Sequence, residues 1–467
     1  MYRKLWLYGM LLCALGIQPV TADESSPQSA GELVDVLSGP NAAAVREERL
    51  NRWFRDAKFG LFLHWGPASI SGAEISWGRM DRIEGGQRLQ KVPGDVYDNL
   101  YRQFNPVKFN ADEWMALAKE AGMKYVVFIT KHHDGFSMWP TEQVRFTEPG
   151  KPVYYNIAET PYQHDICRDI AEAARRHGLR IGWYYSTRDW THPDYLKGDN
   201  KKYNDYYEAQ VRELLTNYGQ VDIMWFDHVA GNWRDYTFKQ LFRMSYELQP
   251  DLLINNRAAR FFMETDDRPS PELATLVQGD YDTPEQKIGT FQNDRAWESC
   301  MTMTHCEDGG GWSYRPDGRI RSLEECLRIL VGTVTGDGNL LLNIGPMPTG
   351  EFQAEEIANL KGMGTWLRAY GESIYGTRGG PWVNGTWGGT THRGSTVYVH
   401  VLECEGTTLE RPPLAGKILT AEVLTGGKAT FDQSDQGVTI ILPKGFQNEV
   451  DTIIKLTLDR PVTVMND

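Results

Sequence analysis

The segment TKHHDGF, residues 130–136, places two histidines and an aspartate directly after a run of β-branched and aromatic residues. An imidazole can ligate a metal ion, take a proton from a nucleophile or hydrogen-bond the hydroxyl groups of a substrate. Because adjacent residues of a strand point in opposite directions, we expect His132 and His133 not to share one metal ion. The motif by itself leaves all three kinds of chemistry open.

Polar and aromatic residues also follow the other apolar runs of the chain, and Asp227 is the most informative of them. It ends the run IMWFD, and no helical pattern follows until about Tyr236, so Asp227 lacks the position of a helix N-cap. An aspartate kept ionised by a nearby Arg257 has the character of a nucleophile. Two downstream glutamates, Glu285 and Glu298, are candidates for the proton donor that would work with it.

The elements that must position these residues alternate between short apolar runs and helical patterns. The apolar runs cover residues 59–66, 124–130, 179–186, 221–227, 252–257 and 339–345. Continuously apolar strands separated by helices are typical of a parallel sheet covered on both faces, and their number approaches eight. We therefore predict a (β/α)₈ TIM-like catalytic barrel, in which the active site lies at the C-terminal ends of the strands.

The pattern changes after Gly376 to short alternating segments separated by Gly, Pro, Asn and Asp. This pattern predicts a β-sandwich at residues 377–467, following a catalytic domain at residues 23–376. We expect the sandwich to brace the barrel, and a sugar-binding accessory role is the alternative.

The first 22 residues have the pattern of a signal peptide. Arg3 and Lys4 precede an apolar run at 5–17, and a small-x-small sequence precedes Asp23. We expect export to the periplasm or the extracellular space. No later stretch of 18 apolar residues exists, so no membrane span is expected in the mature chain.

The formal net charge of −13 argues against a polyanionic partner such as nucleic acid and fits a neutral substrate. The 15 Trp and 22 Tyr suit either a carbohydrate site or a large packed core.

Beyond Cys13, the cysteines are scattered, odd in number and without metal-ligand spacing, so we expect buried thiols rather than a disulfide framework. Nothing in the sequence indicates an oligomeric state.

Seven segments in order resemble the signature segments of the family 29 glycoside hydrolases, the retaining α-L-fucosidases. They are KFGLFLHWG, KHHDGF, WYYS, MWFD, GDYDTPE, WESCMTM and NLLLNIGP, and the match runs from about residue 50 to residue 375. The resemblance implies a catalytic barrel followed by a β-sandwich. It also implies release of terminal α-L-fucose from a fucosylated oligosaccharide or glycoconjugate through a covalent glycosyl-aspartate, without a metal or other cofactor.

The resemblance assigns Asp227 as the nucleophile and favours Glu285 over Glu298 as the acid/base. In a retaining enzyme these two carboxyl groups lie about 5 Å apart. Because Tyr184 and Tyr185 point to opposite faces of their strand, only one can face inward, and we expect Tyr185 to do so. The sugar-binding positions implied by the resemblance are His64, Glu74, Trp77, His132, His133, Tyr185, Trp225 and Arg257.

Two alternatives remain at this point. One is a non-catalytic fucose-binding protein on the same fold. The other is a metal-dependent hydrolase with His64, His132, His133 and Asp227 as ligands.

Overall fold

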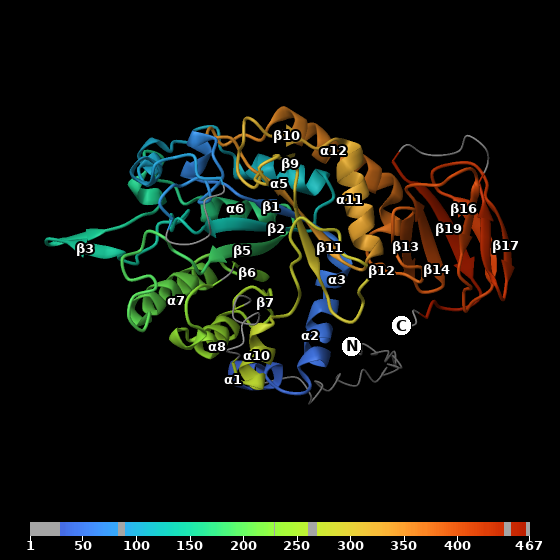
Figure 1. The fold of residues 1–467 in the computed structure, drawn as a ribbon, viewed down its shortest axis with the longest axis horizontal. Coiled ribbons are helices and arrows are strands. Elements are labelled where there is room, and N and C mark those ends of the chain that lie inside the picture. The colour runs from blue at the N-terminus through green and yellow to red at the C-terminus, as the bar shows by residue number, and fades with distance from the viewer. Residues whose placement is uncertain (1–28, 83–88, 228, 260–268, 443–449, 464–467) are drawn as a thin grey trace, which may run out of the picture.

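The computed structural model describes residues 29–82, 89–227, 229–259, 269–442 and 450–463. The predicted signal peptide, residues 1–22, lies outside these residues. Within the described parts, no helix is both long and apolar enough to cross a lipid bilayer. Figure 1 shows a curled sheet surrounded by helices, with antiparallel sheets at one end of the molecule.

Seven parallel strands form the curled sheet, in the order β7-β6-β5-β2-β1-β11-β8. All but one of the side chains in these strands are buried, as continuously apolar runs predict. The strands are β1 (Phe59–Leu63), β2 (Tyr125–Lys131), β5 (Arg180–Ser186), β6 (Ile223–Asp227), β7 (Leu253–Ile254), β8 (Glu298–Thr302) and β11 (Asn339–Ile344).

The eighth position of the barrel is filled by residues 281–285, which pair through single bridges rather than as a regular strand. Tyr281 bridges to Asn255 after β7, and Glu285 bridges to Cys300 of β8. The segment therefore lies between the two edge strands of the sheet and connects them. Together with the β-sandwich described below, this confirms the prediction of a (β/α)₈ barrel followed by a sandwich.

Helices cover the outside of the barrel with their apolar faces, and several of them begin at a capping side chain. In α6 (Ile166–Arg176), the side chain of Asp165 accepts from the backbone N–H of Arg168 at 3.0 Å and caps the first turn. The other helices are α1 (Ala30–Leu37), α2 (Ala42–Asn51), α3 (Phe54–Ala57), α4 (Gly94–Tyr97), α5 (Ala111–Glu120), α7 (Lys201–Thr216), α8 (Phe238–Leu248), α10 (Pro271–Val277), α11 (Leu323–Thr335) and α12 (Ala354–Tyr370).

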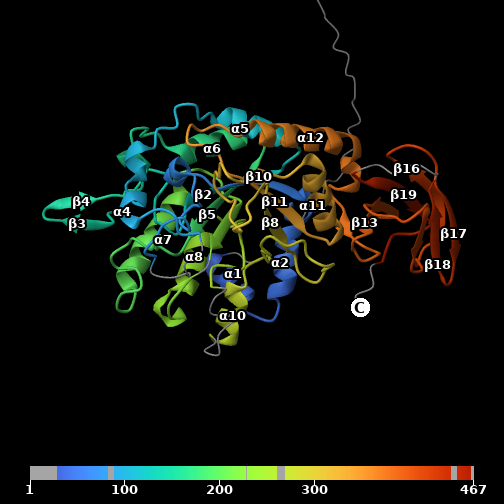
Figure 2. The ribbon, with the colours of Figure 1, turned by 45° about the horizontal axis from the view of Figure 1, so that its top comes forward.

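The C-terminal part is a sandwich of a five-stranded and a three-stranded antiparallel sheet with its own apolar core. Strand β13 packs against helix α11 of the barrel, and the two lie side by side in Figure 2. The five-stranded sheet contains β12 (Arg378–Gly379), β13 (Gly388–Arg393), β14 (Thr396–Val401), β19 (Thr452–Leu458) and β16 (Ile418–Val423). The three-stranded sheet contains β15 (Thr408–Arg411), β18 (Gly437–Ile441) and β17 (Thr430–Ser434).

Two short antiparallel strand pairs lie outside these sheets. They are β3 (Phe146–Glu148) with β4 (Lys151–Val153), and β9 (Thr304–His305) with β10 (Arg319–Ile320). All five cysteines in the described residues are free thiols, and four of them are buried, as predicted.

Candidate active site

Asp227 and Glu285 meet at one nitrogen of Arg257. Asp227 ends β6, and its Oδ1 accepts from Arg257 Nη1 at 3.0 Å. The same Nη1 donates to Glu285 Oε2 at 3.0 Å. Two bonds of this length to one atom hold the carboxyl oxygens within about 6 Å of each other, which fits the separation in retaining glycosidases.

Arg257 is itself fixed by the irregular eighth segment of the barrel. Its Nε donates to Thr283 Oγ1 at 2.8 Å, its Nη2 donates to the Thr283 carbonyl at 2.9 Å, and its guanidinium lies 4.7 Å from the ring centre of Trp225. Burial acts to lower the pKa of Arg257, but the charges of Glu285 and Asp227 raise it above its usual value. The arginine is therefore a permanent cation between two carboxylates.

Glu285 and Glu298 have opposite environments. The Glu285 side chain is 44% exposed, whereas Asp227 is 11% exposed and Glu298 is fully buried. Glu298 is the first residue of β8 and accepts from Tyr125 and, at 3.0 Å, from Trp225 Nε1. Burial raises its pKa to about 7. Glu298 is thus enclosed inside the barrel, and of the two glutamates only Glu285 contacts the arginine that holds Asp227.

The prediction that His132 and His133 point in opposite directions is wrong. Both residues follow the last residue of β2, Lys131, and lie in a turn rather than on the strand. Their ring centres are 4.0 Å apart, and His133 Nε2 lies 3.6 Å from Asp227 Oδ2. The rule of alternating directions applies only within the pleat, so it does not govern the two histidines here.

Three buried imidazoles are oriented by a hydrogen bond at Nδ1. His64 pairs with Asn343 Oδ1, His132 with Ser76 Oγ and His133 with Ser186 Oγ, each at 2.6 Å. Burial lowers the pKa of His64 to about 3 and that of His132 well below its usual range. His64 and His132 are therefore neutral, with Nε2 as a second polar atom that can meet a substrate hydroxyl.

His132, His133 and Asp227 also form a group that could hold a metal ion. One potential ligand atom from each lies within 4.8 Å of the others. The structure thus brings together three of the four residues of the metal-site alternative, while Asp227 already accepts hydrogen bonds from Arg257 and Tyr184.

The prediction that Tyr185 faces the site is wrong, and Tyr184 takes that place. The Tyr184 hydroxyl donates to Asp227 Oδ2 at 2.8 Å, whereas the Tyr185 hydroxyl donates to Gln210 of α7 at 2.9 Å. Alternation along β5 establishes that one of the pair is inward, but not which one. The choice depends on how the strand is rotated relative to the barrel axis, which its neighbours decide.

Glu74 lies in the loop after β1 and is occupied by backbone groups. Its carboxylate accepts from the N–H groups of Gly311, Trp312 and Ser313. These bonds hold the Trp312 ring 4.9 Å from the ring of His64. Glu74 therefore positions Trp312, which was not among the predicted site residues. The run of three glycines just before Trp312 is the signal in the sequence that marks this segment.

Trp77 forms an aromatic wall beside the paired histidines. Its half-buried ring is 5.3 Å from His133 and 5.1 Å from Trp190 in edge-on geometry. Trp225 is inward, as predicted, but lies beneath Arg257 with its Nε1 bonded to Glu298. Of the ten residues predicted for catalysis and binding, the structure brings all except Tyr185 to this end of the barrel or directly beneath it.

Comparison with known proteins gives the family of the chain. The family profile described as Alpha-L-fucosidase matches residues 32–372. An alpha-L-fucosidase of Branchiostoma floridae is 28% identical over 442 residues, covering 88% of this chain and 93% of its own. The plasma alpha-L-fucosidase of Homo sapiens is 30% identical over 359 residues, covering 72% of each chain.

Solved structures show the same relationship. Alpha-L-fucosidase isoenzyme 1 from Paenibacillus thiaminolyticus superposes with a TM-score of 0.75 at 30% identity, covering 89% of this chain and 99% of that chain. A family 29 alpha-L-fucosidase from Bacteroides thetaiotaomicron, trapped as a covalent intermediate, superposes with a TM-score of 0.70 at 26% identity, covering 94% and 98%. The chain described here belongs to the alpha-L-fucosidase family.

Proposed function

We propose that this protein releases terminal α-L-fucose from fucosylated glycans with retention, using Asp227 as nucleophile and Glu285 as acid/base. The observation that carries the proposal is the pair of 3.0 Å bonds from Arg257 Nη1 to both carboxylates. Asp227 attacks the anomeric carbon while Glu285 protonates the departing glycosidic oxygen. Glu285 then removes a proton from water, which attacks the same carbon and releases the sugar from Asp227.

The remaining residues bind the sugar or hold those that do. The neutral His64 and His132 offer polar nitrogens to sugar hydroxyls, and His133 lies beside Asp227. The rings of Trp77 and Trp312 offer apolar faces for the C6 methyl group of L-fucose. Tyr184 and Arg257 donate to separate oxygens of Asp227 and so hold its carboxylate in one orientation.

Azide rescue of two small-residue variants tests both roles. With an aryl α-L-fucoside, Asp227→Gly should lose at least about 10³-fold in kcat, and added azide should yield the inverted β-fucosyl azide. Glu285→Ala should retain the first step on a good leaving group, and azide should yield the retained α-fucosyl azide. Glu298→Ala is the matched control, and formation of the α-azide by this variant instead of Glu285→Ala would contradict the assignment.

The two alternative functions are separated by simple measurements. Exhaustive dialysis against a chelator should leave kcat/KM unchanged. A loss of activity that zinc restores would instead favour a metal held by His132, His133 and Asp227. A wild-type protein that binds fucose but releases no aryl group would favour a non-catalytic binding role.

We also propose that the chain is exported and cleaved after Ala22. The support is the arrangement of Arg3, Lys4, the apolar run at 5–17 and the small-x-small site. The mature N-terminus, read by mass spectrometry of the protein recovered outside the cytoplasm, should be Asp23. Recovery of the intact chain from the cytoplasm would contradict the proposal.

A further inference from the structure

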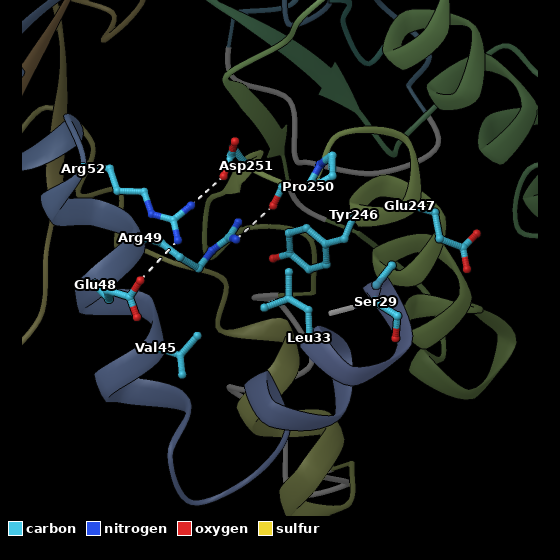
Figure 3. A pocket seen from close by; sticks show the side chains of 11 residues that line it. Ser29, Leu33, Val45, Glu48, Arg49, Arg52, Tyr246, Glu247, Pro250 and Asp251 are labelled. Carbon is cyan, nitrogen blue, oxygen red and sulfur yellow. Dashed lines mark hydrogen bonds and ion pairs between the residues drawn. The ribbon is translucent and has the colours of Figure 1, made fainter. Parts of the chain in front are cut away.

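Two of the cavities in the described part of the chain lie away from the catalytic end of the barrel, and they differ in how their charges are satisfied. The first, of about 380 Å³, lies between α1, α2 and α8 (Figure 3). Its Arg52 forms ion pairs with Glu48 and Asp251, and its Arg49 donates to the carbonyls of Pro250 and Leu252. Both arginines of this cavity therefore already bond to groups of the protein itself.

The second cavity, which we name the junction groove, has a volume of about 790 Å³ and lies between the barrel and the sandwich. The backbone N–H of Gln292 bonds to the carbonyl of Gly336, just before β11 begins. The groove therefore lies towards the N-terminal ends of the strands, away from Asp227 and Glu285. It is lined by residues 290–294 of the barrel and by residues 381–383, 411–415 and 463 of the C-terminal part.

Arg411 is the cation of the junction groove, and none of the residues that the structure describes compensates its charge. Its guanidinium stacks on the Trp387 ring at 3.8 Å, but it forms no ion pair or hydrogen bond with any described residue. Its Nε is buried without an acceptor. Asp294 also lines the groove, but its side chain is exposed and makes no ion pair with Arg411.

An unused guanidinium fork is suited to a planar or tetrahedral anion. Arginine presents parallel N–H donors that match the oxygens of a carboxylate or a sulfate, and stacking on Trp387 presets the plane of the fork. The net charge of −13 makes non-specific anion attraction to this surface unfavourable, so any anion bound here must be held by local contacts.

The remaining walls of the groove have the composition of a sugar site. The Phe291 ring is half-buried and offers an aromatic face, whereas Trp382 is buried in the sandwich core, where its Nε1 donates to the carbonyl of Pro412 at 3.0 Å. The amide side chains of Gln292 and Asn293 line the same groove. An aromatic face beside amide groups can recognise the ring carbons and hydroxyls of a sugar.

We propose that the junction groove binds an anionic sugar residue of a glycan, with its carboxylate or sulfate group on Arg411. The site is separate from the catalytic centre and does not depend on the identity of the catalytic residues.

The test measures binding of small probes to the full chain by calorimetry and ligand-observed NMR. Methyl β-D-glucuronide carries a carboxylate, glucose 6-sulfate carries a sulfate, and methyl β-D-glucoside is the neutral control. At least one anionic sugar should bind with a Kd on the order of 1 mM, and raised salt should weaken it. The anionic sugar that binds more tightly shows whether the site prefers a carboxylate or a sulfate.

Variants at two arginines make the test specific. Arg411→Gln should weaken binding at least tenfold, and Arg411→Lys should weaken it because the fork is lost. Arg212→Gln, which removes the same charge from an exposed position on α7, should have no effect. If Arg411→Gln fails to fold, Phe291→Ala supplies an independent variant that should also weaken binding.

Three outcomes would overturn the proposal: no binding of either anionic sugar at 10-fold above the expected Kd, equal binding of the neutral glucoside, or unchanged binding by Arg411→Gln. Hydrolysis of an aryl fucoside by Arg411→Gln should remain within about twofold of wild type. Failure of the groove proposal is therefore distinguishable from failure of the proposed fucosidase activity.

Discussion

At the scale of residues, the catalytic end is organised around one buried cation. Arg257 bonds to both Asp227 and Glu285, while Tyr184 donates to the second oxygen of Asp227. Each donor fixes a carboxylate before substrate arrives, which lowers the cost of reaching the reactive geometry. Neighbouring side chains of the same type can therefore have very different consequences when replaced.

The tyrosine pair of β5 gives a matched comparison. Tyr184→Phe should lower kcat about 10- to 100-fold, because Asp227 loses one of the donors that orient it. Tyr185→Phe should leave kcat unchanged and lower the free energy of unfolding by about 1 kcal/mol, since it removes the bond to Gln210. Steady-state kinetics and thermal unfolding of both variants check this, and an activity loss confined to Tyr185→Phe would contradict the geometry.

Glu298 predicts a stability difference that depends on pH. Its pKa is about 7 in the fold and 4.5 in the unfolded chain, so between these values the native state retains a proton that the unfolded state has lost. Wild-type stability should therefore fall as pH rises from 4.5 to 7, by at most about 3 kcal/mol, and then level off.

Glu298→Gln is neutral at every pH and keeps groups that can bond to Tyr125 and Trp225. Its melting temperature relative to wild type should rise between pH 5 and pH 8. A difference that does not change with pH would show that the buried carboxyl does not titrate in this range. Glu285→Gln, at an exposed position, is the control.

At the scale of elements, two loops at the barrel mouth are joined by charges. In the segment 306–318, Arg315 is 1% exposed and bonds to Asp308 and Asp317. Lys91, from the loop that also contains Glu74 and Trp77, lies 3.2 Å from Asp308 and 3.6 Å from Asp317. The cluster holds the backbone that carries Trp312 beside His64.

Replacing Arg315 should loosen this segment without touching the carboxylates that do the chemistry. Arg315→Gln should raise KM for an aryl fucoside about tenfold, equivalent to about 1.4 kcal/mol, with a smaller change in kcat. Arg319→Gln, which removes an exposed pair with Glu325 just after the segment, is the matched control and should leave KM unchanged. Equal effects of the two variants would contradict a positioning role for the cluster.

At the scale of the whole molecule, barrel and sandwich are joined through Asp337, whose side chain is fully buried. Its carboxylate lies 2.6 Å from Arg378 Nη2, 3.4 Å from Arg55 Nη1 and 3.8 Å from Lys58 Nζ. It also accepts the backbone N–H of Gly379 at 2.8 Å. One carboxylate thus compensates cations from the N-terminal helices and from the first strand of the sandwich.

Asp337→Asn should destabilise the protein, because it leaves buried cations without a counter-charge. We expect a loss of about 3 kcal/mol, seen as a fall of several degrees in melting temperature. Asp459→Asn removes an exposed charge from the sandwich and should have little effect. An unchanged melting temperature for Asp337→Asn would contradict the role of this contact.

The sequence by itself determined the barrel, the sandwich and the positions of Asp227, Arg257 and the histidines, because continuous apolar runs and strand ends are local patterns. The sequence did not predict that residues 281–285 close the barrel, because this segment pairs only through single bridges and lacks the apolar run of a regular strand. Nor did it show that Glu298 is enclosed while Glu285 reaches Arg257.

Tertiary structure alone decided the direction of Tyr184 against Tyr185 and the convergence of His132 with His133. Alternation along a strand is a local property, but its phase depends on how neighbouring strands rotate it about the barrel axis. A residue beyond the strand end follows the turn instead, and the turn here depends on Gly135, where a side chain would lie 2.2 Å from Asp189. Such contacts join residues far apart in the chain, so only the folded packing specifies them.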